Sequence, residues 1–297
     1  MPRRPRTTTW PYGFRFPRSG TLAARDYWVS FEEINLFAAF ILRMASHIEH
    51  LAPIMVNMEL TLANTAEERQ KITAKQESWR GPLSELSAHS QFYNEAFLVR
   101  HVENYLSYLS ALLFEVFQER PETMRSSEKV ELDFVLEHRS YDSLVQGLAE
   151  KKVEALSYSS FERLSQFFQD QFHLSICTSK DLPLIREAIE TRNISVHNRC
   201  RISRRYLEKV PETKWKLGST RYLGIADIDL LVPALHKAVS QLDREARHHL
   251  RLPGIRFDVR AIQAEKFEEG HTRLQENLKK IETAPSQPIR KRKPSGA

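Results

Sequence analysis

The longest apolar repeat in this sequence lies between residues 90 and 119, and it limits the folds open to the chain more than any other feature. Its apolar side chains follow one another at spacings of four and three residues, the period of a helix with one buried face. These positions are Leu98, Val102, Tyr105, Leu109, Leu112 and Val116. Pro121 closes the segment. Because such a helix needs partners to cover its apolar face, the repeat predicts a bundle.

The rest of the chain predicts further helices and few strands. The sequence has only 9 glycines and few runs of β-branched residues. Helical periodicity or helix-start signals mark residues 31–51, 65–79, 128–138, 141–156, 159 onward, 179–207, 228–250 and 257–281. The fold class predicted from these segments is all-α.

Local signals predict where these helices begin and end. Three pairs match the capping-box pattern: Ser30 with Glu33, Thr65 with Glu68, and Ser159 with Glu162. Ser179 or Asp181 can cap the helix that follows them, with Pro183 in its first turn. Pro53 is expected to end or kink the first helix, and Gly270 to interrupt the last.

Composition divides the chain into five parts. Residues 1–29 are expected to form a basic, proline-rich arm, and residues 283–297 a basic disordered tail. Between them we expect N-terminal helices in residues 30–89, a main helical domain in residues 90–252 and a C-terminal helical segment in residues 253–282. The prediction is therefore a helical bundle with additional helices at both ends.

The net charge of +6 does not describe the central part of the chain. Residues 1–20 hold five arginines and residues 283–297 hold four basic residues, and neither stretch has an acidic residue. The two ends together carry +9, so the +6 total leaves about −3 for the remainder. The overall charge is therefore no evidence for a nucleic-acid surface on the bundle, and the basic ends either hold RNA without sequence preference or are merely disordered.

Composition also excludes several classes of protein. Hydrophobic residues make up 41% and charged residues 28%, which is typical of a globular chain. Cys177 and Cys200 form neither a metal-ligand pattern nor a disulfide framework, and no leading apolar segment suggests secretion, so a reducing cytoplasm is expected. The longest apolar runs, residues 34–42 and 105–114, are far shorter than the roughly 20 residues of a membrane span.

No metal or cofactor is expected. His47 and His50 lie near Glu49, and His248 is followed by His249, but neither group has a set of carboxylates or cysteines at ligand spacing. These histidines are expected on solvated helix faces.

The helix predicted after residue 179 carries polar side chains where its pattern calls for apolar ones. Its apolar stripe consists of Leu182, Ile185, Ile189 and Val196, with Ala188 beside them. Arg192 and Asn193 lie in the same arc, and burying them costs several kcal/mol unless both are paired. A polar ribbon along the edge of the stripe consists of Arg186, Glu190, Asn193 and His197.

This stretch resembles the HEPN superfamily of ribonucleases. Arg192, the polar Asn193 after it and His197 after four intervening residues match the R-x4-6-H signature of that superfamily. The wider string ETRNISVHN, the apolar run before it and the Tyr206-Leu207 pair after it are similar to the branch called RiboL-PSP-HEPN. The resemblance covers about residues 90–250, and it implies an all-α bundle of HEPN type.

The resemblance also implies metal-independent cleavage of RNA, in which the 2′-hydroxyl attacks the adjacent phosphate and leaves a cyclic phosphate and a 5′-hydroxyl. His197 is the implied proton carrier, because an imidazole titrates near neutral pH. Arg192 is expected to bind the phosphate as its negative charge grows, and Asn193 to orient His197 or bind the phosphate. The expected substrate-binding or orienting residues are Glu190, Asn198 and Arg186.

One histidine per chain is too few for a reaction that uses an acid and a base together. In an ideal helix the directions of Arg192 and His197 differ by about 140°. We therefore expect a two-fold homodimer that brings both copies to one cleft, and by resemblance the family builds composite sites in this way. Arg199 stands where some HEPN toxins carry a tyrosine that a partner enzyme modifies, so that regulation is not expected.

The expected protein is thus a cytoplasmic toxin or effector of a defence or stress system. Its expected partners are RNA, a second copy of the chain and a regulatory or antitoxin protein, with no membrane partner. Two alternatives stay open: a catalytically inactive HEPN module that binds RNA or a protein, and a helical DNA-binding or scaffold protein that uses its tails. Composition alone also allows Arg192 and His197 ordinary structural roles.

Overall fold

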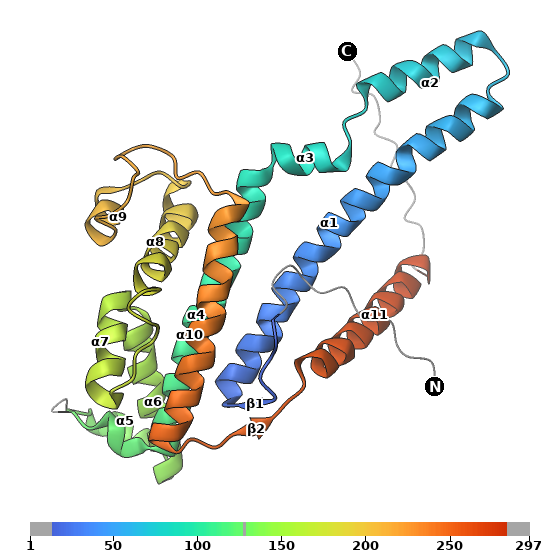
Figure 1. Cartoon of the computed structure of the whole chain (residues 1–297). Helices are drawn as coiled ribbons and strands as arrows, with labels where there is room; N and C mark the ends of the chain where they lie inside the picture. Colours follow the sequence, from blue (N-terminus) through green and yellow to red (C-terminus); the bar gives the residue numbers. More distant parts are fainter. Residues whose placement is uncertain (1–13, 127–128, 284–297) are drawn as a thin grey trace, which may run out of the picture. The chain divides into compact units, whose positions relative to one another are not determined.

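The computed structural model describes residues 14–126 and 129–283, which form an all-α protein (Figure 1). In chain order the helices are α1 (Leu22–Leu62), α2 (Ala66–Ser78), α3 (Pro82–Ala88), α4 (Ser90–Glu119), the 3₁₀ turn η1 (Pro121–Met124), α5 (Leu132–Glu137), α6 (Tyr141–Ser157), α7 (Phe161–Phe172), α8 (Leu182–Asn198), α9 (Arg204–Lys209), α10 (Ile225–Leu250) and α11 (Val259–Thr283). Two short strands, β1 (Ser19–Gly20) and β2 (Ile255–Arg256), pair antiparallel. No helix in these described ranges is long and apolar enough to cross a membrane.

The chain divides into two compact units, residues 1–257 and residues 258–297. The first unit contains α1 to α10 and both strands, and the second contains α11. The expected boundary at residue 30 falls inside α1, because the helix begins nine residues before the start of its predicted segment, residue 31.

α4 is the central helix of the first unit. It contacts α1, α3, α6, α8 and α10 (Figure 1). All six apolar positions of the predicted repeat are at most 2% exposed. The expected bounds of this helix, residues 90–119, are confirmed, because one continuous apolar face can bury against several neighbours at once.

α1 begins after Thr21, so the expected capping box at Ser30 is wrong. The Thr21 hydroxyl accepts a hydrogen bond from a first-turn N–H of α1 and donates one of 2.6 Å to Asp243 of α10. A Cβ atom at Gly20 would lie 2.9 Å from the Asp243 carboxylate, so only glycine fits there without a shift. The start of α1 is therefore determined by a carboxylate 222 residues away in sequence.

α1 does not end at Pro53, and α11 is not interrupted at Gly270, so these two expectations are wrong. α1 continues through Pro53, which is exposed, so water can reach the carbonyl that proline leaves without a donor. α11 continues through Gly270, whose cost of about 1 kcal/mol relative to alanine is too small to interrupt a 25-residue helix. The Thr65 capping box is confirmed, whereas α7 is capped by Ser160 rather than Ser159. α5 is shorter than predicted, and the start predicted for it, residue 128, lies outside the described residues.

Aromatic side chains of α1 pack against α4 in the core of the first unit. Trp28 and Phe31 of α1 are fully buried, and Tyr27 lies with its ring 5.7 Å from that of Tyr108 on α4. His101 of α4 is 2% exposed, with its ring 5.4 Å from that of Phe31. Burial lowers the pKa of His101 to about 4, because an apolar environment disfavours the imidazolium ion.

Acid is therefore expected to destabilise the fold through His101. Above pH 6.5 the ring is neutral in both the folded and the unfolded chain. Between pH 6.5 and about 4 the unfolded chain binds a proton that the folded chain excludes, so roughly 3 kcal/mol of stability is lost as the pH falls. Urea unfolding at pH 7 and pH 4.5 measures this loss. A His101→Gln variant, which cannot titrate there, should lose clearly less, and an equal loss in both proteins would contradict the assignment.

Candidate functional site

The start of α8 is held in place by α10. Asp181 occupies the N-cap position, but its carboxylate does not cap the helix. It accepts hydrogen bonds from the Thr178 hydroxyl at 2.6 Å and the Lys237 ammonium of α10 at 2.9 Å. The Lys237 bond lowers the pKa of Asp181 below its ordinary value. Pro183 lies in the first turn, as the sequence predicts.

One face of α8 is buried against neighbouring elements of the first unit. The last turn of the helix is exposed. The buried residues are Ile185, Ala188, Ile189, Glu190, Thr191 and Ile194. Val196 belongs to the predicted apolar stripe but is 53% exposed. Periodicity gives the direction of a side chain, but not how far the covering helices extend. The last turn of α8 therefore ends in solvent.

Arg192 is the centre of a network of side chains that joins α8 to α4. Its guanidinium donates to the Glu103 carboxylate of α4 at 3.2 Å and to the Asn193 side-chain oxygen at 3.2 Å. Asn193 in turn donates to Glu190 at 3.4 Å. Arg192 is half-buried, with 27% of its side chain exposed. The structure thus brings together three predicted site residues and one residue, Glu103, that the sequence did not point to.

His197 lies in the exposed last turn of α8. In the part of the chain that the structure describes, no hydrogen bond joins its ring to Arg192 or Asn193. The helix ends after it because the N–H groups of Arg199 and Cys200 both donate to the carbonyl of Ile194. Arg199 and Cys200 have φ values of 49° and 57°, a left-handed conformation that costs roughly 1–2 kcal/mol at each non-glycine residue. Helices often end with a left-handed residue, and α7 and α10 do so at His173 and Arg251.

The remaining predicted residues have separate partners. Asn198 donates to the carbonyl of Arg201 at 2.7 Å, which closes the turn after α8. The Arg186 guanidinium lies 3.7 Å from the Glu162 carboxylate of α7, which also accepts from Lys209 at 2.7 Å. Arg186 is therefore tied to α7 and not to the Arg192 network.

Four arginines follow His197 closely and are all exposed. This arginine cluster consists of Arg199, Arg201, Arg204 and Arg205. Residues 199–205 contain no acidic residue. The net charge of the whole chain concealed this local concentration, although a count over a seven-residue window finds it. Side chains of this kind are typical contacts for phosphate groups.

The segment after α8 is anchored by a buried arginine. Arg221 has 9% of its side chain exposed and lies 2.7 Å from Asp227 of α10 and 3.3 Å from Glu187 of α8. Its N–H donates to the carbonyl of Cys200 at 2.8 Å, and its guanidinium lies 5.0 Å from the ring centre of Trp215. Through these contacts Arg221 links the segment that contains the arginine cluster to α8, which precedes it, and to α10, which follows it.

Tyr206 gives the same segment an apolar anchor. Its ring is fully buried against Ile194 of α8, together with Ile202 and Val210. Its hydroxyl donates to Glu187 at 3.3 Å. Tyr206 therefore keeps the arginine cluster close to the end of α8.

The two cysteines do not provide a reactive thiolate. Burial raises the pKa of both Cys177 and Cys200 to about 11, so both thiols are protonated at neutral pH. Among the described residues, no group of three or more His, Cys, Asp or Glu side chains could hold a metal ion. The groups available for chemistry at the end of α8 are therefore imidazole, guanidinium, amide and carboxylate groups, and no thiolate.

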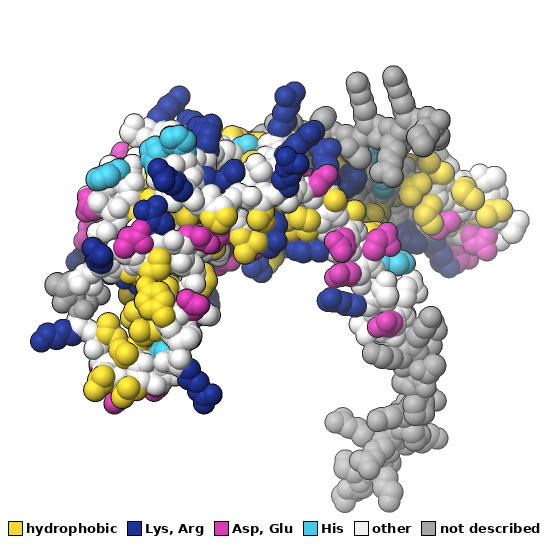
Figure 2. All heavy atoms as spheres, turned by 90° about the horizontal axis from the view of Figure 1, so that it is seen from below, with side chains coloured by type: hydrophobic (Ala, Val, Ile, Leu, Met, Phe, Trp, Pro, Cys, Tyr) yellow, Lys and Arg dark blue, Asp and Glu magenta, His cyan; other side chains and the backbone are white. Residues whose placement is uncertain are grey.

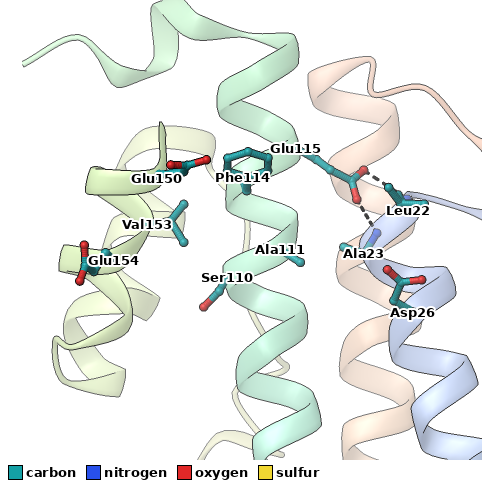
Figure 3. A pocket seen from close by; sticks show the side chains of 10 residues that line it. All are labelled: Leu22, Ala23, Asp26, Ser110, Ala111, Phe114, Glu115, Glu150, Val153 and Glu154. Atoms are coloured by element: carbon teal, nitrogen blue, oxygen red, sulfur yellow. Dashed lines mark hydrogen bonds between the residues drawn. The ribbon is translucent and has the colours of Figure 1, made fainter. Parts of the chain in front are cut away.

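A pocket of about 510 Å³ lies elsewhere in the first unit, between α1, α4 and α6 (Figure 3). Four carboxylates line it, those of Asp26, Glu115, Glu150 and Glu154. Glu115 already accepts from the N–H groups of Leu22 and Ala23 at the start of α1. Burial raises the pKa of Glu115 above its ordinary value. None of the predicted site residues lines this pocket.

The geometry at the end of α8 can be compared with known proteins only through the sequence motif itself. No protein-family model, curated protein or solved structure matches this chain.

Proposed function

We propose that this chain is a metal-independent endoribonuclease of HEPN type that acts as a toxin or effector in the cytoplasm. The observation that supports this most is the exposed His197 ring at the end of α8, beside the arginine cluster. An imidazole open to solvent can exchange protons with a substrate, and the nearby guanidinium groups can hold a phosphate backbone. The R-x4-H spacing of Arg192 and His197 adds the resemblance to this physical argument.

In this proposal each group has a defined task. His197 takes the proton from the RNA 2′-hydroxyl, whose oxygen forms a bond to phosphorus while the bond from phosphorus to the 5′-oxygen breaks. Arg192 binds the phosphate as its charge grows, and Glu103 positions that guanidinium. Asn193 and Glu190 hold Arg192 from the other side. Asn198 shapes the turn, and Arg186 acts at most as an orienting residue from the edge of the site.

The departing 5′-oxygen needs a proton, and a single chain offers no second histidine in this turn. We propose that the His197 of a second copy supplies it. The exposed turn of α8, with Val196 and His197 at its surface, leaves room for such an approach. A composite site of this kind also overcomes the divergent directions of Arg192 and His197.

A catalytically inactive module that binds RNA or a partner protein is the second candidate. The observation that favours it is the Arg192–Glu103 ion pair, which neutralises the guanidinium before any phosphate arrives. In that case the arginine cluster would still bind a nucleic-acid backbone, but no bond would break.

Cleavage of a mixed RNA substrate in EDTA tests the proposal. The wild-type protein is expected to cut the RNA and leave 2′,3′-cyclic phosphate and 5′-hydroxyl ends, which mass spectrometry and kinase labelling identify. An Arg192→Ala/His197→Ala variant should leave the RNA intact. Cleavage that requires a divalent metal, or 5′-phosphate ends, would contradict the mechanism. RNA binding without cleavage by the wild-type protein would support the second candidate instead.

A further inference from the structure

The outer half of α1 exposes large apolar side chains along its whole length. Ten of them are between 44% and 73% exposed, and all except Leu42 lie on or beside one side of the helix. These nine are Phe37, Phe40, Met44, Ile48, Leu51, Ile54, Met55, Met58 and Leu62. Figure 2 shows hydrophobic side chains at the surface of this end of the molecule. Single exposed apolar residues are ordinary, but a continuous set marks an interaction surface.

These side chains follow a heptad pattern. Positions 37, 41, 44, 48, 51, 55, 58 and 62 alternate at spacings of four and three residues, and every one is apolar. They are occupied by Phe37, Ile41, Met44, Ile48, Leu51, Met55, Met58 and Leu62. An unbroken repeat of this kind over about four heptads is the seam of a coiled coil. We call it the α1 seam.

No other described element of the first unit buries the α1 seam. α1 packs against α3 and α4 through a different side, on which Ala38 and Ala45 are buried. α2 follows directly but has no buried residue of its own. The seam therefore stays exposed although the helix that carries it is part of the first unit.

The exposed apolar area of the α1 seam and its neighbouring residues is large enough for a stable dimer interface. Phenylalanine side chains bury about 150–250 Å² each when fully covered, and Leu, Ile and Met bury less, so at 44–73% exposure roughly 100 Å² of each of the nine remains open. Together they offer about 900 Å² per chain, or about 1,800 Å² between two copies. Specific protein interfaces typically bury about 1,200–2,000 Å² in total.

Charge favours a second copy of this chain over other occupants. Residues 36–62 contain one arginine, two glutamates and no lysine, whereas helices that bind a membrane surface are rich in Lys and Arg. The positions that flank a coiled-coil seam usually carry the charges that select a different partner. Two of them, Ala38 and Ala45, are already buried within the first unit. The flanking positions that stay open to a partner are uncharged except for Glu59: Phe40, His47, Ala52, Ile54, Glu59 and Thr61. Pairing with itself brings no like charges together.

We propose that the α1 seam pairs with the α1 seam of a second copy and makes this protein a homodimer. The arrangement is a two-fold interface in which the same surface serves both partners. It goes beyond the proposed ribonuclease and does not depend on it, because the seam contains none of the site residues. It is a separate contact from the approach of two α8 ends that the proposed ribonuclease needs.

Light scattering coupled to size-exclusion chromatography of the full chain tests the inference. The wild-type protein is expected at twice the chain mass of 34.7 kDa. A Leu51→Glu/Met58→Glu variant places two charges per chain in the seam and should dimerise at least about 100-fold more weakly. The matched control, His50→Glu/Asn57→Glu, changes exposed residues off the seam of the same helix and should remain dimeric. Circular dichroism should show the same helix content in all three.

Three results would overturn the proposal. They are a monomeric wild-type protein at tens of micromolar, a dimer that survives the two seam glutamates, and a dimer lost equally in the control. Binding of the monomeric wild-type protein to phosphatidylcholine and phosphatidylserine vesicles would assign the seam to a membrane surface instead. The mass measurement needs no RNA, so its failure is distinct from failure of the proposed ribonuclease.

Discussion

Replacing His197 by alanine is expected to lower the rate of RNA cleavage by about 10²- to 10⁴-fold, the usual contribution of a positioned proton carrier. The fold should be unaffected. The ring is exposed, and exposed substitutions of this kind change stability by only about 0.5 kcal/mol. Single-turnover cleavage in EDTA measures the rate, and thermal unfolding monitors the fold.

The matched control for this variant is His249→Ala. His249 is also exposed and also lies in the last turn of a helix, α10, but it is not one of the predicted site residues. It should cleave at the wild-type rate. Equal rates for wild type and His197→Ala would exclude His197 as the proton carrier. Arg192→Ala is a less clean test, because it also removes the ion pair that joins α8 to Glu103 of α4.

Replacing Arg221 by methionine is expected to destabilise the first unit by about 3 kcal/mol, the low end of the range for breaking a buried ion pair. The arginine side chain has 9% exposure, and its partners Glu187 and Asp227 have 30% each, so water can reach the partners in part. Their charges would nevertheless stay unpaired beside the buried Tyr206. Urea unfolding at pH 7 measures the effect.

A triple variant tests whether the unpaired carboxylates cause the loss of stability in Arg221→Met. Arg221→Met combined with Glu187→Gln and Asp227→Asn removes all three charges, so it should be more stable than Arg221→Met alone. Arg244→Ala is the control, because Arg244 is exposed on α10 and its loss should change stability by less than about 0.5 kcal/mol. If Arg221→Met were no less stable than this control, the anchor would have no energetic role.

Much of the secondary structure could be predicted from local patterns. The bounds of α4, the Thr65 capping box and Pro183 in the first turn of α8 agree with the sequence, because each depends on residues within a few positions of one another. The predicted cap at Ser30 and the predicted helix end at Pro53 are wrong, because both features depend on surroundings that local patterns do not record. The start of α1 depends on Asp243 of α10, and its passage through Pro53 depends on exposure to water.

The candidate site likewise contains residues that the sequence identifies and partners that only the structure reveals. Arg192, Asn193 and His197 stand out in the sequence, because their spacing breaks an apolar stripe and matches a motif. The neighbours of these residues in the fold cannot be recognised in the sequence. Glu103 reaches Arg192 from 89 residues away, and Val196 is exposed although its position in the helical period predicts burial.

The sequence by itself determined the all-α class, the central helix α4 and the residue types at the end of α8, because helical periodicity and motif spacing are local properties of a chain. Only the tertiary structure decided which polar side chains are paired, which last turn reaches solvent and which apolar stripe remains uncovered. Those outcomes depend on how far neighbouring helices extend and where they cross. The contacts concerned join residues far apart in sequence, and no local pattern records them.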